Sequence, residues 1–210
     1  MPLQNRVLPT GEIVAHAGRG TLMGNRGCIH RPDRTLGVTR WRSKLWICCT
    51  LTWKDVRRDV MPPGRWTALF FLDEPTALAA GHRPCAYCRR SDYVWYADSW
   101  PKRLKAFEMD AVLHRERVEP YTRRQVTHQA TTADLPDGAM VRHDGRAALL
   151  VDGHALPWSF DGYGQPVPLR RRTRVEVLTP PANVAAMRAG YRPLVHPSAP
   201  ASPGLRPFIE

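Results

Sequence analysis

A Cys-x-x-Cys pair, formed by Cys85 and Cys88, is the feature that most constrains how this chain can fold. The pair lies between Gly81-His82-Arg83-Pro84 and Arg89-Arg90. Two thiolates at this spacing can hold half of a tetrahedral zinc site. Gly81 and Pro84 are typical of the end of a helix, so the pair is expected on a fixed turn just beyond one. We therefore expect a zinc knuckle with basic surroundings.

The charge balance favours a polyanionic partner. The chain carries 31 Lys and Arg residues against 19 Asp and Glu residues, a formal net charge of +12, and most of its cations are arginine. Guanidinium groups suit forked contacts with phosphate, so we expect contact with nucleic acid. The alternative explanation is a high-GC genome, which raises the Arg, Ala and Pro contents together.

Composition also bears on compartment and size. The 210 residues suffice for one full-sized domain with a small appendage, and the five cysteines are odd in number. An odd cysteine count in a chain without an apolar signal core favours metal binding or plain burial over disulfides. No stretch of about 18 apolar residues is present, so we expect a cytoplasmic protein that makes no contact with a membrane.

The pattern of elements predicts an α+β fold. Apolar, β-branched runs indicate strands at 45–53 and 66–72, and Asp73 is placed to cap a short helix that stops at Gly81. Further on, the sequence predicts a long helix, a hairpin with Asp144-Gly145 at its tip, a short strand and a small helix (101–118, 141–151, 175–178 and 182–189). We expect a small zinc-knuckle α/β part, a connecting helix, a mainly antiparallel β part, and an extended or loose Pro-rich tail (1–98, 99–119, 120–192 and 193–210).

The knuckle supplies two metal ligands, and two more must come from elsewhere. Cys28 and His30 are the first choice because they share a Gly-flanked loop and both carry ligand atoms. Cys48 and Cys49 are an alternative, although neighbours on a strand face opposite sides, so at most one of them can reach a given metal. Other combinations join Cys28 or Cys49 with a histidine (His30, His82 or His196).

The segment 77–90 (Ala77-Leu78-Ala79-Ala80-Gly81-His82-Arg83-Pro84-Cys85-Ala86-Tyr87-Cys88-Arg89-Arg90) resembles the end of the zinc module of Ada-type proteins, which repair methylphosphotriesters in DNA. The resemblance implies that Cys85 and Cys88 ligate zinc and that DNA, rather than RNA, is the partner. The family's other two ligands come from an upstream Cys-x-x-x-Cys, which this chain lacks. The resemblance is strong over about 15 residues, extends loosely over at most about 50, and does not reach residues 100–210.

Three classes of function follow. The first is a zinc-containing nucleic-acid-binding protein connected with DNA repair or modification, whose phosphate contacts would be two groups of arginines (Arg83, Arg89 and Arg90; Arg170, Arg171 and Arg172). The second is a zinc-dependent enzyme, a nuclease or transferase acting on nucleic acid or a nucleotide. For it, Asp110 and His114 are acid and base candidates, since they are four residues apart on one helix face; a structural salt bridge is the alternative. The third is a protein–protein adaptor with a Trp-rich surface.

Overall fold

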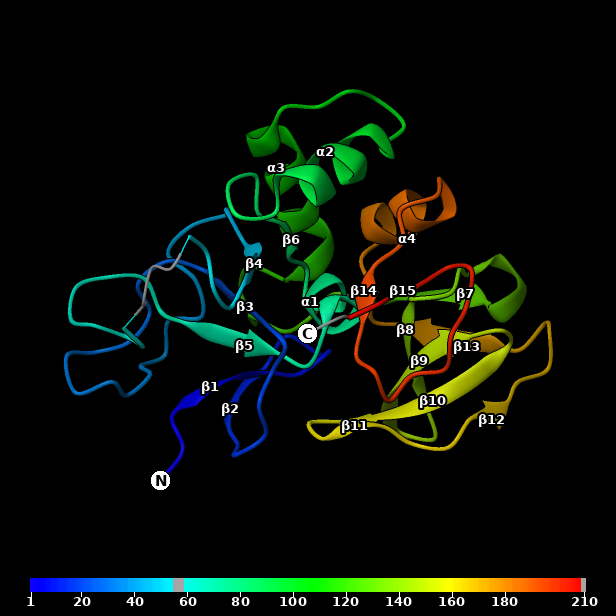
Figure 1. Cartoon of the computed structure of the whole chain (residues 1–210), viewed down its shortest axis with the longest axis horizontal. Coiled ribbons are helices and arrows are strands. Elements are labelled where there is room, and N and C mark those ends of the chain that lie inside the picture. Colours follow the sequence, from blue (N-terminus) through cyan, green and yellow to red (C-terminus); the bar gives the residue numbers. More distant parts are fainter. Residues whose placement is uncertain (55–58, 209–210) are drawn as a thin grey trace.

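A computed structural model of the chain describes residues 1–54 and 59–208. The described residues form an α+β fold with two large sheets side by side and four α-helices (Figure 1). The predicted fold class is thus confirmed. Both sheets pair mainly antiparallel neighbours.

The first sheet carries the N-terminal cysteines. Its strand order is β2-β1-β5-β3-β4-β6, with parallel pairing only between β1 and β5 and between β4 and β6. The strands are β1 (Gln4–Val7), β2 (Ile13–Ala15), β3 (Leu22–Asn25), β4 (Ile47–Thr50), β5 (Leu69–Phe71) and β6 (Arg83–Pro84). The strands expected at 45–53 and 66–72 correspond to β4 and β5. The short edge strand β6 brings the knuckle alongside β4.

Helix α1 (Glu74–Ala79) is fully buried and lies between the two sheets (Figure 1). Asp73 caps it, because its carboxylate accepts hydrogen bonds from the Thr76 amide (3.1 Å) and hydroxyl (2.7 Å). Small side chains allow close approach: Ala77 packs into the core of the first sheet, and Ala79 packs into that of the second. One short helix therefore joins both cores.

Gly81 ends this helix for two physical reasons. Its φ of +79° lies in the left-handed region, and a Cβ atom there would be 2.3 Å from Cδ of Arg117. Every residue other than glycine would meet both obstacles. The expected helix stop is confirmed, and it directs the chain into β6.

The second sheet follows the order β11-β10-β9-β8-β13-β7, with β12 paired to β10. Its strands are β7 (His128–Thr131), β8 (Met140–His143), β9 (Arg146–Val151), β10 (His154–Ser159), β11 (Gly162–Tyr163), β12 (Val167–Pro168) and β13 (Arg174–Val177). The β8–β9 hairpin turns at Asp144 (φ +47°) and Gly145 (φ +74°), as Asp-Gly predicts. The pairings in this sheet are antiparallel.

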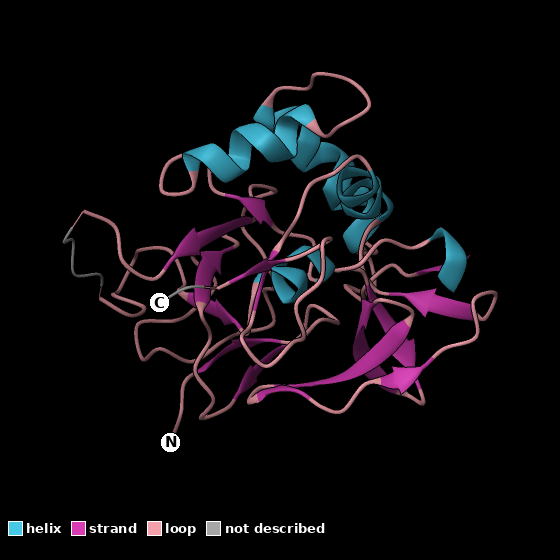
Figure 2. Ribbon diagram, turned by 45° about the vertical axis from the view of Figure 1, so that its right-hand side comes forward, coloured by secondary structure: helices cyan, strands magenta, loops and turns pink. Residues whose placement is uncertain are grey.

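The longer helices gather on one side of the molecule (Figure 2). They are α2 (Arg90–Asp98), α3 (Ala106–Arg117) and α4 (Pro181–Arg188). Tyr96 of α2, Met109 of α3 and Met187 of α4 meet in one apolar cluster with Val141 and Val177 of the second sheet. None of the helices in the described part of the chain is long and apolar enough to cross a lipid bilayer.

The Pro-rich tail differs from expectation, because its described residues pack against the body. Strands β14 (Leu194–Val195) and β15 (Arg206–Pro207) pair in parallel, and Val195 and Leu205 are buried. The amides of Leu194 and His196 donate to the carboxylates of Glu74 (2.8 Å) and Asp73 (3.1 Å). The buried carboxylates of Asp73 and Glu74 therefore hold in place a tail that is rich in proline and has few core-forming side chains.

Candidate metal centre

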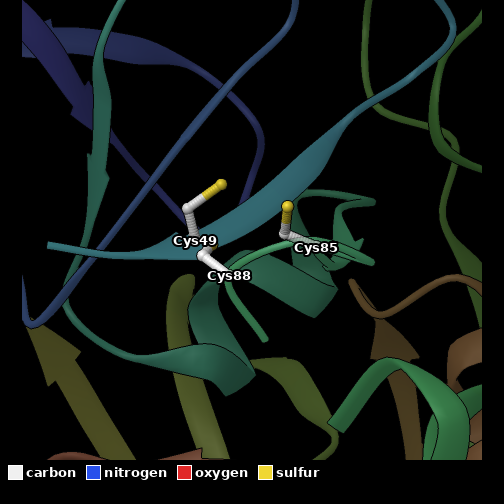
Figure 3. Close-up of side chains that lie close together, drawn as sticks. All are labelled: Cys49, Cys85 and Cys88. Carbon is white, nitrogen blue, oxygen red and sulfur yellow. The ribbon is translucent and has the colours of Figure 1, made fainter. Parts of the chain in front are cut away.

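Three buried cysteines form the group best suited to a metal ion. The sulfur atoms of Cys49, Cys85 and Cys88 all lie within 4.8 Å of one another (Figure 3). Thiolate is a preferred ligand of soft and borderline cations such as Zn²⁺. The group can therefore hold a metal ion through three protein ligands.

The pairing of β4 with β6 decides which strand cysteine joins the knuckle. Cys48 is in register with Pro84, and the Cys85 amide donates to the Cys48 carbonyl at 2.9 Å. Since successive side chains on a strand alternate, Cys49 points to the side of Cys85, whereas Cys48 lies in the core on the other side. Of the two, only Cys49 therefore joins the knuckle cysteines, as strand alternation predicts for one residue of such a pair.

The knuckle itself is a tight turn that runs into α2. The Tyr87 amide points at the Cys85 sulfur (3.4 Å), and the Arg89 amide donates to the Cys85 carbonyl (3.1 Å). Arg89 then serves as the N-cap residue of α2. These bonds fix both sulfurs on one side of the turn, where Cys49 meets them.

Mutual hydrogen bonding shapes the acidity of the three thiols. Hydrogen bonds from Cys49 and Cys88 lower the pKa of Cys85 to about 2. The same contacts, together with burial, raise the pKa of the Cys49 thiol. One sulfur of the group thus holds negative charge readily while its neighbours donate to it. A cation would replace those shared protons when it binds.

The spacing and surroundings fit a metal of modest size. Sulfurs bonded to one tetrahedral zinc lie roughly 3.8 Å apart for a Zn–S length of about 2.3 Å, so a slight contraction would bring the three sulfurs to the spacing of zinc ligands. Met23, Met61 and Ala68 pack around the three cysteines in one apolar cluster. Such a shell keeps competing water away and favours a site that stabilises the fold.

The structure does not bring the first-choice ligands, Cys28 and His30, into this group. The His30 ring is buried, with Nδ1 2.7 Å from the Thr67 hydroxyl and Nε2 3.2 Å from the Pro62 carbonyl. The Cys28 sulfur is half-buried and lies 3.9 Å from the His30 carbonyl. Both ring nitrogens of His30 are thus engaged in holding the loop onto Thr67 and Pro62.

The other two histidines considered as ligands also lie elsewhere. His82 is fully buried between the rings of Trp46 and Phe71, where burial and two nearby arginines hold its pKa well below the usual value. His196 contacts the Ser198 hydroxyl through Nδ1 at 2.8 Å. Among the described residues, the three cysteines are the whole group.

Two of the arginines expected at phosphate are instead buried ion-pair partners. Arg83 is 1% exposed and makes a two-pronged pair with Asp110, with both N–O distances at 2.8 Å. Arg89 lies between Glu74 (2.8 Å) and Asp92 (2.7 Å). Neither guanidinium is placed where a phosphate could reach it, which corrects the expectation for both.

The acid and base candidates on α3 are separated by these contacts. Asp110 is buried against Arg83, while the His114 ring lies edge-on to Trp41 and Trp46 and 3.2 Å from Arg117. Burial and the charge of Arg117 lower the pKa of His114 to about 4. Asp110 does form a structural ion pair, but its partner is Arg83 and not His114 or Arg117 of its own helix.

Aromatic and cationic side chains lie beside the three cysteines, and among them Trp53 is half-buried and packs against the cysteine cluster. Tyr87, between the two knuckle cysteines, is 67% exposed and packs edge-on against Trp53 at 5.8 Å. Lys54 lies over the same indole at 5.7 Å, and Arg90 is exposed at the start of α2. We call these four residues (Trp53, Lys54, Tyr87 and Arg90) the knuckle face. Trp53, Arg90 and Cys88 line a surface groove of about 900 Å³.

The second arginine group stands apart from the knuckle face. Arg170, Arg171 and Arg172 are exposed in the loop between β12 and β13. Sequence reasoning identified these cations and Arg90, but not Trp53 or Lys54, because nothing in the spacing links residues 53–54 to 87–90. The signal that could have suggested Tyr87 is its position inside the Cys-x-x-Cys turn.

The comparisons with known proteins add no further assignment. No family model matches the chain, and no curated protein or solved structure is significantly similar to it. The function must therefore be inferred from the site.

Proposed function

We propose that this chain is a zinc-containing protein that binds nucleic acid, with DNA as the favoured partner. The observation that carries the proposal is the convergence of Cys49, Cys85 and Cys88 beneath an exposed surface of aromatic and cationic side chains. In this arrangement the metal fixes the turn that runs from Cys85 to Cys88. The turn then positions the aromatic and cationic side chains that contact the nucleic acid. The site has a structural role.

Zinc is the metal best suited to this ligand set. Three thiolates in an apolar shell favour a borderline-soft cation without redox chemistry, whereas Mg²⁺ and Ca²⁺ prefer oxygen ligands. Hydrogen bonds from Cys49 and Cys88 lower the pKa of Cys85, which favours the thiolate form that binds metal. With zinc bound, β4, β6 and the start of α2 are clamped together at one point.

The knuckle face supports binding to a flexible strand. Tyr87 and Trp53 offer π-surfaces to unstacked bases, while Lys54 and Arg90 offer charge to the phosphates between them. The formal charge of +12 adds a long-range attraction, and the exposed arginines of the β12–β13 loop extend it. Arg83 and Arg89 support the turn from within.

The alternative, a zinc-dependent enzyme, rests on the number of protein ligands that the metal would have. Three protein ligands leave a fourth position open, which is the arrangement of catalytic zinc sites. The apolar shell of methionines and alanine argues against it, because no described His, Asp or Glu joins the group. The structural role is therefore the better supported of the two.

Binding to labelled single-stranded DNA, followed by fluorescence anisotropy over a series of salt concentrations, tests the proposal. Tyr87→Ala is expected to weaken binding by about 1–3 kcal/mol, the usual contribution of one stacked base. Arg90→Gln should reduce the salt dependence by about one phosphate contact. Tyr121→Ala is the matched control, because Tyr121 is 92% exposed at a different part of the surface.

The proposal is contradicted if the zinc-loaded wild-type chain binds neither DNA nor RNA. If the Tyr87→Ala and Tyr121→Ala variants bind DNA equally well, the knuckle face is not part of the contact surface. An RNA strand of the same sequence decides between the two partners. Loss of DNA binding when zinc is chelated, with recovery on re-addition, would tie the metal to the contact surface.

A further inference from the structure

A cavity of about 950 Å³ lies between the first sheet, the end of α3 and the second sheet. Six arginines line it against two glutamates, and one of these, Glu176, is paired with Arg142. The other, Glu12, is exposed. The cavity contains none of the cysteines, so it is independent of the proposed zinc site.

Arg26, at the base of the cavity, is a buried cation without a carboxylate. It is 2% exposed, and it donates to the Gly11 carbonyl (2.9 Å) and to Nε2 of His82 (3.4 Å). Its Nη2 atom has no hydrogen-bond partner, and no described carboxylate lies within ion-pair distance of it. Buried arginines are ordinarily paired, since an isolated charge is costly to remove from water.

Arg117 places a second positive charge beside the first. Its guanidinium lies 3.7 Å from the centre of the Trp46 ring, and that of Arg26 lies 3.9 Å from it. Two groups so close to one ring centre would collide on the same face, so the indole is held between them. Arg117 donates to the Lys44 carbonyl (2.7 Å) and the Gly81 carbonyl (2.5 Å), and no described carboxylate pairs with it.

The electrostatics of this stack favour an anion. Burial and the charge of Arg40 lower the pKa of Arg26 to about 9. Burial and the charge of Arg26 likewise lower the pKa of Arg117 well below its usual value. An anion in the cavity would relieve both effects, because it supplies the opposite charge that the fold leaves out.

Unpaired polar atoms concentrate around the same cavity. Of the eight buried side-chain atoms without a hydrogen-bond partner among the described residues, four belong to its lining: Thr10 Oγ1, Arg26 Nη2, Arg117 Nε and Gln125 Oε1. Buried polar groups are rarely left unpaired, and a cluster of them indicates a site built for a polar ligand. Gln125 is itself fixed, since its amide group donates to the carbonyls of Pro9, Ala79 and Leu178.

We infer that this cavity binds a phosphate monoester of a small aromatic compound, with the phosphate at Arg26 and Arg117 and the ring near Trp41. Charged N–H donors suit the several oxygens of a phosphate dianion, and Arg26 Nη2 and Arg117 Nε are the donors left unpaired here. More cations line the cavity than one carboxylate would need. The volume exceeds what inorganic phosphate fills, and half-buried Trp41 lines the remaining space. Free nucleotides and the 5′-phosphate end of a nucleic acid share this chemistry.

Titration of the full, zinc-loaded chain with adenosine 5′-monophosphate tests the inference, by calorimetry and by the fluorescence of the lining tryptophans. Adenosine is expected to bind about 10- to 100-fold more weakly, because it lacks the charge-assisted bonds. Arg26→Met should weaken binding to a similar degree. It removes a buried charge but leaves the Gly11 carbonyl and His82 Nε2 without their donor, so the melting temperature is measured alongside. Arg188→Met, at an exposed position of α4 outside the cavity lining, is the control and should leave binding unchanged.

Two further arms make the outcome decisive. Arg40→Gln, at a half-buried lining position, should also weaken binding and serves if the Arg26 variant does not fold. Comparison with 5′-phosphorylated and 5′-hydroxyl oligonucleotides distinguishes a free nucleotide from a strand end. The inference is overturned if neither the monophosphate nor the phosphorylated strand binds, or if both bind the Arg26 and Arg40 variants as well as wild type. Tyr87→Ala should leave monophosphate binding intact, which separates this result from the knuckle face.

Discussion

Exchange of single sulfur atoms on β4 provides the sharpest test of the metal centre. Cys48 and Cys49 are both buried neighbours on one strand, yet only the Cys49 sulfur joins Cys85 and Cys88. We expect Cys49→Ser to abolish stoichiometric zinc binding and Cys48→Ser to retain it. The two variants share the chemistry of the change, the strand and the depth of burial, so the difference isolates the role in the metal group.

The size of the effect follows from linkage. Zinc at 100 times its dissociation constant adds about 2.7 kcal/mol to the stability of a protein that binds it only when folded. For a domain of about 150–250 residues, each kcal/mol shifts the melting temperature by about 2–4 °C. Wild type should therefore lose about 5–11 °C when a chelator is added, and Cys49→Ser should lose nothing further.

Cys48→Ser should keep the zinc site but lose stability for a different reason. It puts a hydroxyl into the apolar core, which costs about 1–3 kcal/mol, although Arg89 Nη1, 3.5 Å from the Cys48 sulfur, offers a partner. Its melting temperature should fall, and the chelator should lower it again by the same amount as in wild type. Metal content by elemental analysis and thermal unfolding measure both quantities. Retained zinc in Cys49→Ser, or lost zinc in Cys48→Ser, would refute the assignment of the site.

Two further predictions concern buried charge. Asp110→Ala leaves Arg83 without its partner and should cost about 3–5 kcal/mol in urea unfolding, whereas the double change Arg83→Met with Asp110→Leu should recover most of that loss; equal instability of the two would contradict a structural pair. In the folded protein the pKa of His82 is well below the value near 6.5 of the unfolded chain. The neutral imidazole therefore contributes fully to the free energy of unfolding at pH values above the unfolded pKa. That contribution is lost as the pH falls below it, by about 1.4 kcal/mol between pH 7.5 and 5.5. His82→Gln should flatten this part of the pH profile, and an unchanged slope would count against the buried neutral imidazole.

Local rules predicted helix ends and a hairpin turn well. Asp73 as a cap, Gly81 as a stop and Asp144-Gly145 as a hairpin turn each depend on a residue and its immediate neighbours, and all three appear in the structure. The Cys-x-x-Cys spacing likewise predicted that Cys85 and Cys88 would face one another. Such features are set within a few residues, where sequence and conformation are closely coupled.

Long-range pairing explains what the sequence could not predict. Arg83 and Arg89 were expected at phosphate because composition reports the amount of charge and not its location. Their partners Asp110 and Glu74 lie 27 and 15 positions away, and only the packed structure brings them together. The tail was expected to be loose for a similar reason, since prolines describe its composition and not the buried carboxylates that hold it.

The identity of the third cysteine of the group depends on the pairing register of β4 and β6, which the sequence does not reveal. Cys28 and His30 are the first choice from the sequence, and they lie outside the group. For the alternative on β4, strand alternation allows at most one of Cys48 and Cys49, and either residue could serve if β6 were shifted by one position along β4. The observed register, with Cys48 opposite Pro84, places Cys85 one step beyond and turns Cys49 toward it. A single pairing register therefore determines the ligand set. For this reason the exchange of Cys48 and Cys49 tests the register of the sheet and the identity of the site in one experiment.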